Sequence, residues 1–383
     1  MKLTKMSLVA ALLVGSSAFA IENTKVSGDA RLFYSTTKQG NTDLFNKAGA
    51  MAQGALGLGL TTDLTTGVSA GAHLTALSTL GLEGQLVDGV WEATNGTDDS
   101  FWFDEAWLAG TVGNTTGKIG RMQLDTPLVF SETWSIATNT FEAAVLINQD
   151  ISDTTLVGAY VGGSNGGDGS GAVIGAMNAN GTTNFSQFYN GAYAVGAINN
   201  SYAPLTAQAW YYDATSVLTA YWLQADLSMD GIMAGLQYTA IDPAAANAKS
   251  TDAFAFMLGY EMKDMFSAKA SYSKVSKNGA AGGNLSGSGQ SKLYTEGWLN
   301  FVVAAADTTA YNVTIEAPLA GYDFGLYATM ADTSAADTAS TELTATAARS
   351  YGPLDTALAL TYFDSDAAGS KAGTIQAFLT YNF

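Results

Sequence analysis

Gly373-Thr374-Ile375-Gln376-Ala377-Phe378-Leu379-Thr380-Tyr381-Asn382-Phe383 is a stretch in which apolar and polar side chains alternate. One face carries Ile375, Ala377, Leu379, Tyr381 and Phe383, and the other carries Thr374, Gln376, Thr380 and Asn382. Alternation of this kind predicts a half-buried β-strand. A soluble sheet can contain such a strand. A final strand that ends on an aromatic residue is, however, typical of a transmembrane β-barrel, whose last strand pairs with its first and faces lipid.

The rest of the chain reads as similar segments of about ten residues separated by turn residues, which is the pattern of a transmembrane antiparallel β-barrel. The chain is therefore expected to be all-β, with eighteen strands. An even number of strands places both ends of the barrel on the same side of the membrane. The expected strands are 25–36, 48–60, 67–77, 101–112, 117–124, 140–149, 154–163, 188–198, 205–213, 217–228, 231–241, 252–263, 266–276, 308–317, 322–330, 342–351, 353–364 and 372–383.

The links between these segments alternate in length. Short links follow the even-numbered segments, for example at 61–66, 113–116 and 229–230, and longer links follow most of the odd-numbered ones. Short periplasmic turns and long external loops are the rule in outer-membrane barrels. The link at 214–216 breaks this rule, because it should be long and is short.

The beginning of the chain predicts a signal peptide at 1–20. Lys2 and Lys5 precede the apolar run 8–14, and Ala18-Phe19-Ala20 supplies a small-residue cleavage site after Ala20. The alternatives are an uncleaved anchor or a buried helix. The mature chain, 21–383, is then expected to form one barrel domain in the bacterial outer membrane. No other segment approaches the length of a transmembrane helix.

The composition agrees with a membrane barrel. The mean hydropathy is slightly positive at +0.11, Cys is absent, and only 5 Pro occur in 383 residues. Pro interrupts paired strands and is therefore scarce in them. The formal net charge of −18 argues against nucleic acid as a partner. The acidic residues could favour cations at a pore mouth or bind divalent ions, or they could simply keep external loops soluble.

Several stretches carry a resemblance to a known family. They are 31–36 (RLFYST), 75–84 (TALSTLGLEG), 105–110 (EAWLAG), 120–127 (GRMQLDTP), 130–135 (FSETWS) and 141–150 (FEAAVLINQD). Through them the chain resembles Opr-family outer-membrane porins of epsilon-proteobacteria, which are related to the Campylobacter major outer membrane protein. The C-terminal half is similar mainly in its strand layout.

The resemblance implies an eighteen-stranded passive diffusion porin that lies in outer-membrane lipid and forms a homotrimer. It also implies insertion by the barrel-assembly machinery, with Tyr381 and Phe383 as the assembly signal. The Campylobacter relative further implies a lumenal calcium site, although its ligands are not transferred to residues of this chain.

Charged residues are expected to line the pore. Asp29 and Arg31 share the inward face of the first strand, because Ala30 and Leu32 take the apolar face. Asp125, Glu132 and Glu296 lie in long links. Arg121 is also assigned to the pore, although strict alternation puts it on the apolar face unless Gly120 introduces a bulge or the residue lies near the membrane interface.

Two long links are candidates for loops that fold into the barrel and constrict it. The link 125–139 contains Asp125 and Glu132, and the link 277–307 turns apolar at 294–303. An apolar stretch needs burial, which the lumen would supply. The alternatives for 294–303 are an additional strand, which would make the strand number odd, or a contact between subunits.

The channel is expected to need no cofactor, with calcium as the candidate ligand. Carboxylates suit calcium, and Asp125 and Asp150 are its predicted ligands. The segment Gly163–Gly171 is similar to one copy of a calcium-binding repeat but is better explained as a flexible loop.

An enzyme is not expected. His73 is the sole His, and no nucleophile motif surrounds it. The predicted function is a water-filled channel for ions and small hydrophilic solutes with a mild preference for cations. The alternative is a structural or adhesive surface protein without a specific transport role.

Overall fold

The computed structural model describes residues 22–78, 80–81, 100–132, 136–166, 185–287, 289–366 and 371–383. The predicted signal peptide and its cleavage site after Ala20 lie outside the described residues. No helix in the described part of the chain is long and apolar enough to cross a membrane.

Eighteen strands account for most of the described chain. They are β1 (Glu22–Gln39), β2 (Ala50–Thr65), β3 (Val68–Ser78), β4 (Ser100–Val112), β5 (Thr115–Met122), β6 (Phe141–Asn148), β7 (Thr154–Ser164), β8 (Ser186–Asn199), β9 (Leu205–Ala214), β10 (Leu218–Met229), β11 (Ile232–Pro243), β12 (Thr251–Met262), β13 (Phe266–Val275), β14 (Thr308–Leu319), β15 (Tyr322–Thr333), β16 (Thr338–Tyr351), β17 (Leu354–Ser365) and β18 (Ala372–Asn382). Three short 3₁₀ helices lie in links: η1 (Lys47–Gly49), η2 (Phe301–Ala304) and η3 (Ser334–Ala336).

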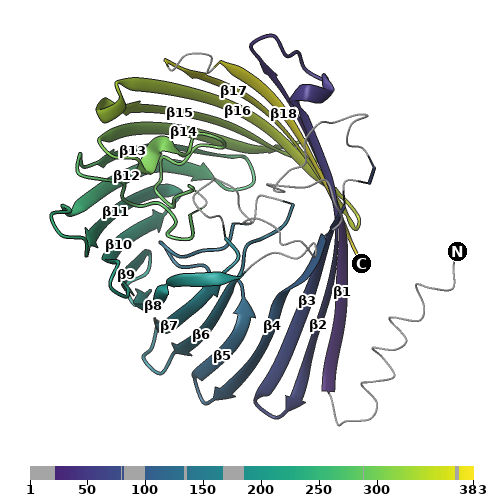
Figure 1. Cartoon of the computed structure of the whole chain (residues 1–383), viewed down its shortest axis with the longest axis vertical. Helices are drawn as coiled ribbons and strands as arrows, with labels where there is room; N and C mark the ends of the chain where they lie inside the picture. Colours follow the sequence, from purple (N-terminus) through teal and green to yellow (C-terminus); the bar gives the residue numbers. More distant parts are fainter. Residues whose placement is uncertain are drawn as a thin grey trace, which may run out of the picture.

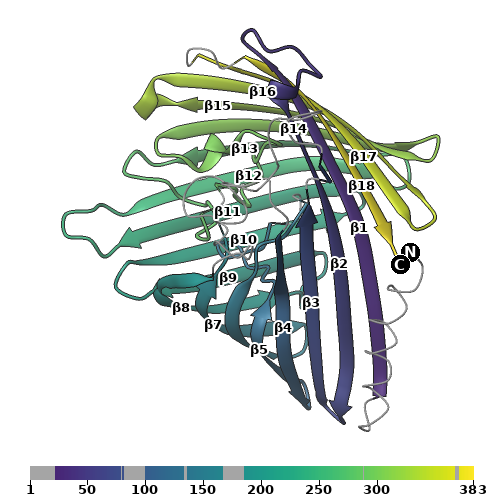
Figure 2. The ribbon, with the colours of Figure 1, turned by 45° about the vertical axis from the view of Figure 1, so that its right-hand side comes forward.

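Each strand pairs antiparallel with its neighbours in sequence, and β1 also pairs with β18, so the sheet closes on itself. Figures 1 and 2 show this ring of strands. Closure leaves no strand edge without hydrogen bonds, which a barrel in lipid requires. The predicted eighteen-stranded barrel is therefore confirmed.

The closing seam differs in detail from the prediction. The first strand was expected to end at residue 36, but β18 pairs with Asp29 through Gln39. Phe383 extends the seam by one residue, because its backbone exchanges hydrogen bonds with Gly28 in both directions, at 2.7 and 2.8 Å. The shift follows from the length of β1, which continues to Gln39 rather than ending near residue 36.

Side chains alternate across the barrel wall as the sequence predicts. On β11, Leu236 and Tyr238 are exposed on the outer face, whereas Gln237 and Thr239 are buried on the lumen side. On β18, Gln376 is buried in the lumen while Tyr381 and Phe383 are exposed outside. An apolar outer face and a polar lumen are the arrangement that membrane barrels adopt, because the outer side chains meet hydrocarbon.

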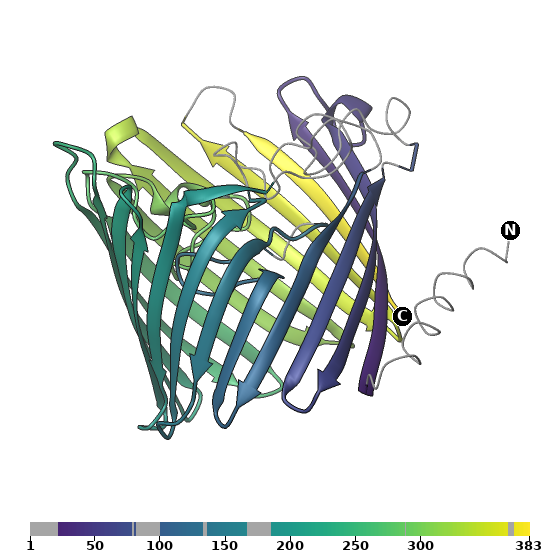
Figure 3. The same ribbon diagram turned by 60° about the horizontal axis from the view of Figure 1, so that its bottom comes forward.

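The two rims of the barrel differ (Figure 3). Short turns join even strands to odd ones at one rim, for example at 113–114 and 352–353, and β1 begins and β18 ends at this short-turn rim. Most of the longer links leave the opposite, long-loop rim. The link at 215–217 is short, as the sequence indicated, and the link after β15 shrinks to 334–337 because both flanking strands are longer than predicted.

Candidate functional site

Two links do not stay at the rim but pack inside the barrel. We call them the first inserted loop (described at 123–132 and 136–140) and the second inserted loop (276–307, described except 288). Leu128 from the first and Leu293 from the second are buried in one cluster with the wall residues Phe141, Trp210 and Trp222. Both predicted constriction loops therefore enter the lumen. The segment 294–303 forms no additional strand and ends in η2.

The first inserted loop is fixed to two sides of the wall. Its tip is a tight turn in which Thr126 and Val129 exchange hydrogen bonds, and Leu128 N donates to the Tyr212 hydroxyl of β9 at 3.3 Å. On the opposite flank of this loop, an Arg31 guanidinium nitrogen donates to the Ile136 carbonyl at 2.6 Å. The loop is thus held between β1 and β9.

The second inserted loop is fixed to β16 and β18. The Glu342 carboxylate accepts hydrogen bonds from Trp298 N and Leu299 N, each at 2.6 Å. The Trp298 indole donates to Gln376 at 2.8 Å, and Asn300 donates to Ser340 at 3.0 Å. Glu342 is 0 % exposed, so water does not reach its carboxylate. The two backbone N–H donors supply the hydrogen bonds that water would give to an exposed carboxylate.

The same loop is also fixed to the wall at β10, β11 and β13. The Tyr294 hydroxyl donates to Asp226, and Gln237 accepts from Tyr294 N at 3.1 Å while donating to the Lys292 carbonyl at 2.9 Å. Thr295 shares a hydrogen bond of 2.6 Å with Ser273. A loop held at this many points narrows the lumen as a rigid element.

The two inserted loops meet each other. Leu285 N donates to the Leu128 carbonyl at 2.8 Å, and the Asn284 side chain donates to the Phe130 carbonyl at 2.8 Å and to Glu132 at 3.2 Å. The Lys292 ammonium pairs with the Asp125 carboxylate and lies 4.8 Å from the centre of the Phe130 ring.

A cavity of about 510 Å³ opens where the two loops meet. It is lined by Gln123, Leu124, Asp125, Phe130, Ser131, Glu132, Gln290 and Lys292. The Asp125 side chain is 89 % exposed there, so the structure places this predicted pore-lining residue on an open part of the lumen.

Glu132 and Glu296 occupy a different environment from the predicted one. Both were assigned to the pore surface, but Glu132 is 3 % exposed. The Glu296 carboxyl is also enclosed, since one oxygen accepts from Ser291 at 2.6 Å and the other has no hydrogen-bond partner. Burial raises the pKa of the Glu296 carboxyl to about 8, and the neighbouring Glu132 and Glu342 contribute to the shift. Glu132 thus contributes a largely buried side chain to the wall of the cavity between the loops, and the Glu296 carboxyl lies within the second inserted loop, bound to Ser291.

Asp29 and Arg31 lie on the lumen side of β1, as predicted. Arg31 pairs with Asp29 at 2.6 Å. His73 on β3 contacts Asp104 at 2.7 Å and lies 3.9 Å from Asp29, while Thr75 donates to Asp104 at 2.9 Å. Every charged group here has an opposite partner on the wall, so the cluster supports the barrel and the first inserted loop.

The assignment of Arg121 to the pore is wrong. Its neighbours Gly120 and Met122 face inward with Ala143 and Phe141, so Arg121 points outward. There it pairs with Glu142 at 2.9 Å and lies 3.8 Å from the centre of the Phe185 ring. Both charged residues lie at the ends of their strands nearest the long-loop rim, where the interface hydrates charge.

The calcium ligands predicted from the sequence do not come together. Asp125 follows β5, which ends toward the long-loop rim, whereas Asp150 follows β6, which ends at the short-turn rim. Asp150 accepts a hydrogen bond of 2.6 Å from Asn148. Within the described ranges, no group of three or more His, Cys, Asp or Glu side chains could hold a metal ion. Asp125 and Asp150 thus do not fit a shared site. Most of the glycine-rich segment at 163–171 lies outside the described residues.

Acidic groups gather on the lumen wall near the short-turn rim. A cavity of about 470 Å³ is lined by Glu261, Glu316 and Asp323, among other residues. Glu316 accepts hydrogen bonds from Tyr327 at 2.9 Å and Ser267 at 3.3 Å. Lys269 shares the inward face of β13 with Ser267, so negative groups outnumber positive ones on this part of the wall.

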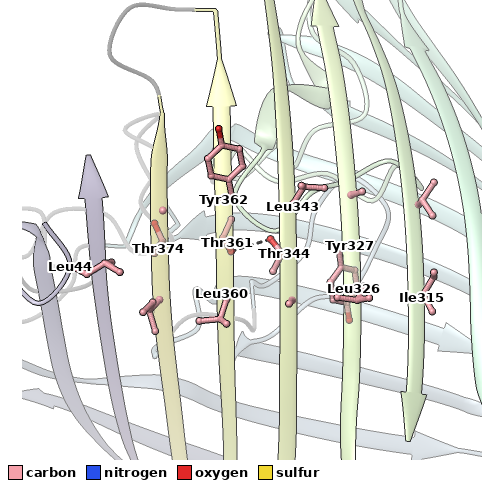
Figure 4. Close-up of a pocket in the computed structure, with 15 residues that line it drawn as sticks. Leu44, Ile315, Leu326, Tyr327, Leu343, Thr344, Leu360, Thr361, Tyr362 and Thr374 are labelled. Atoms are coloured by element: carbon pink, nitrogen blue, oxygen red, sulfur yellow. Dashed lines mark hydrogen bonds between the residues drawn. The ribbon is translucent and has the colours of Figure 1, made fainter. Parts of the chain in front are cut away.

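The outer wall also has a shallow apolar groove, of about 550 Å³, that spans β14 to β18 (Figure 4). Its outward residues include Ile315, Leu326, Leu343 and Leu360, and Leu44 of the β1–β2 link lies at one end of it. This groove faces away from the lumen, where lipid chains would fill it. It is not part of a solute path.

Sequence reasoning missed Glu342 and Lys292. Glu342 could have been found, because a carboxylate within an alternating strand must face the lumen. Its role could not, since its partners Trp298 and Leu299 are distant in the sequence. Lys292 had no signal beyond its place in a long link.

Solved structures of similar fold include one that is named as a porin. Pseudomonas aeruginosa OccK3 (OpdO) has a TM-score of 0.70 and 14% identity, over 97% of this chain and 99% of that one. Acinetobacter baumannii OccAB1 has a TM-score of 0.77 and 12% identity, over 95% and 97%. A BenF-like porin from Pseudomonas fluorescens Pf-5 has a TM-score of 0.75 and 12% identity, over 94% and 99%.

Such low identity shows a shared fold alone. No protein-family model matches the chain, and no curated protein matches it significantly. A closed antiparallel barrel with an apolar outer face and a polar lumen belongs in a bacterial outer membrane, which agrees with the predicted location.

Proposed function

We propose that this protein is a porin, a channel for passive diffusion of ions and small hydrophilic solutes across the outer membrane. The observation that carries the proposal is a closed barrel whose lumen is narrowed, from inside, by two loops fixed to the wall and to each other. Selectivity in such channels depends on lumen width and on the charges that line it.

We also propose a mild preference for cations. Glu261, Glu316 and Asp323 near the short-turn rim, and Asp125 where the loops meet, would raise the local concentration of cations. Lys292 and Lys269 offset part of this charge, so the preference should be modest. No cofactor is required by this mechanism.

The relation to epsilon-proteobacterial Opr porins and the Campylobacter major outer membrane protein is likewise a proposal, supported by the stretches at 31–36, 105–110 and 120–127. A homotrimer and insertion by the barrel-assembly machinery follow from that relation. Crosslinking of the purified protein in mild detergent tests the trimer, and migration as a monomer would contradict it.

Two measurements on the purified barrel test the function. Liposomes that contain it should swell in isotonic solutions of small neutral sugars, at rates that fall as the sugar becomes larger. In a salt gradient across a planar bilayer, the reversal potential should have the sign expected for cation preference. A reversal potential of the sign expected for anions would refute the preference for cations. Liposomes that fail to swell in any of the sugar solutions would contradict passive diffusion.

A further inference from the structure

We propose that Lys292 sets the ion selectivity of the channel by supplying the countercharge to Asp125 at the meeting point of the two inserted loops. This inference rests on the proposed channel function and adds this residue pair to the acidic groups near the short-turn rim as a determinant of selectivity. Lys292 belongs to the second loop and Asp125 to the first, so the pair also lies across the narrowed part of the lumen.

The position of Lys292 is fixed by its surroundings. Its carbonyl accepts a hydrogen bond of 2.9 Å from Gln237 on the β11 wall, and its ammonium lies 4.8 Å from the centre of the Phe130 ring. The side chain is 33 % exposed, compared with 89 % for Asp125. An anchored ammonium with one side open to the lumen can interact with passing ions as well as with its partner.

The charges that line the cavity determine how strongly the Lys292 ammonium affects the ions that pass it. The cavity where the loops meet is lined by three charged residues, Asp125, Glu132 and Lys292, and Lys292 is the single positive one. The other basic residue of the second loop, Lys277, lies two residues after the end of β13 and is exposed at the long-loop rim. Removal of the Lys292 charge would leave Asp125 uncompensated, whereas removal of Asp125 would leave an unpaired ammonium.

The test measures the permeability ratio of K⁺ to Cl⁻ from reversal potentials in a KCl gradient. Lys292→Gln should raise this ratio by roughly threefold or more, because an uncompensated charge in a narrow lumen creates a potential of kT size. Asp125→Asn should lower the ratio. The double variant should return close to the wild-type value, and Lys292→Arg should retain it. Lys277→Gln is the matched control and should change the ratio much less.

A purely structural role for the pair predicts something different. If the pair only fastened the loops together, Lys292→Gln and Asp125→Asn would change the ratio in the same direction, and that result would overturn the proposal. An unchanged ratio in Lys292→Gln would overturn it as well. Heat-modifiable migration in gels identifies folded barrels before each recording. A folded wild-type protein that conducts no ions would instead contradict the proposed function itself.

Discussion

Glu342 shows how a single carboxylate can hold an element of the lumen in place. Both of its oxygens accept backbone hydrogen bonds from the second inserted loop, and no part of the residue is exposed. A hydrogen bond to a charged group contributes about 1.5–3 kcal/mol, and a buried donor left unpaired costs about 1–3 kcal/mol.

Replacing Glu342 by Ala should therefore loosen the loop at Trp298 and Leu299. We expect larger open-channel current noise and higher mean single-channel conductance, measured in planar bilayers. Glu316→Ala is the control, because Glu316 is a lumen carboxylate whose partners Tyr327 and Ser267 both belong to the wall. Noise in Glu342→Ala equal to that of the control would contradict the assigned role.

Glu296 should make the stability of the second inserted loop depend on pH. Its pKa rises from the ordinary 4.5 to about 8 because the carboxyl is buried, so the folded loop favours the protonated form. The stabilisation from this proton is complete below the ordinary pKa and is lost as the pH rises through the raised one. Open-channel noise should therefore increase between pH 5 and about 9. In Glu296→Gln it should stay at the low-pH level, and a pH-independent wild type would rule out this account.

For single residues, the sequence predicted which side of the barrel wall a side chain faces better than it predicted how buried that side chain is. Alternation correctly placed Asp29 and Arg31 in the lumen. It also predicted that Arg121 faces outward, and the assignment of Arg121 to the pore was wrong because it departed from that pattern. The burial of Glu132 and Glu296, and the place of Asp150 at the opposite rim from Asp125, were not foreseen because links have no period to follow. Their surroundings depend on contacts between segments far apart in the chain.

The second inserted loop is fixed to the lumen wall at several strands. Its segment 294–303 packs against β10, β13 and β16 through Tyr294, Thr295 and Trp298. Deletion of 295–302 should raise single-channel conductance, since it removes material from the lumen without removing a strand. Deletion of 245–248 from the link between β11 and β12 at the long-loop rim is the control and should leave conductance close to wild type. Equal conductances in the two deletions would show that the loop does not constrict the channel.

Strands could be predicted from the sequence because each is a local pattern. All eighteen were found, and most ends were placed within a few residues of those in the structure. The larger errors concern β1, β2 and β16, which continue into polar residues such as Lys38, Asp63 and Ser340 beyond the apolar alternation. Hydrogen bonding to neighbouring strands extends these segments, and a single strand's sequence carries no record of it.

Closure of the whole molecule depends on the seam between β1 and β18. Phe383 completes this seam, because its backbone pairs with Gly28 and its ring occupies the space where a Cβ of Gly28 would lie, 2.4 Å from the nearest ring atom. Deletion of Phe383 should reduce the heat-modifiable, folded fraction in outer membranes several-fold, while the channels that do form keep wild-type conductance. Normal assembly without Phe383 would contradict the prediction that it is an assembly signal.

The whole barrel is proposed to be an open but narrowed channel. The most direct measurement is the current through a planar bilayer after addition of purified, heat-modifiable protein. We expect stepwise increases in conductance, each with a current that is linear in voltage and proportional to salt concentration at high salt. Folded barrels that enter the bilayer and produce no steps would contradict it.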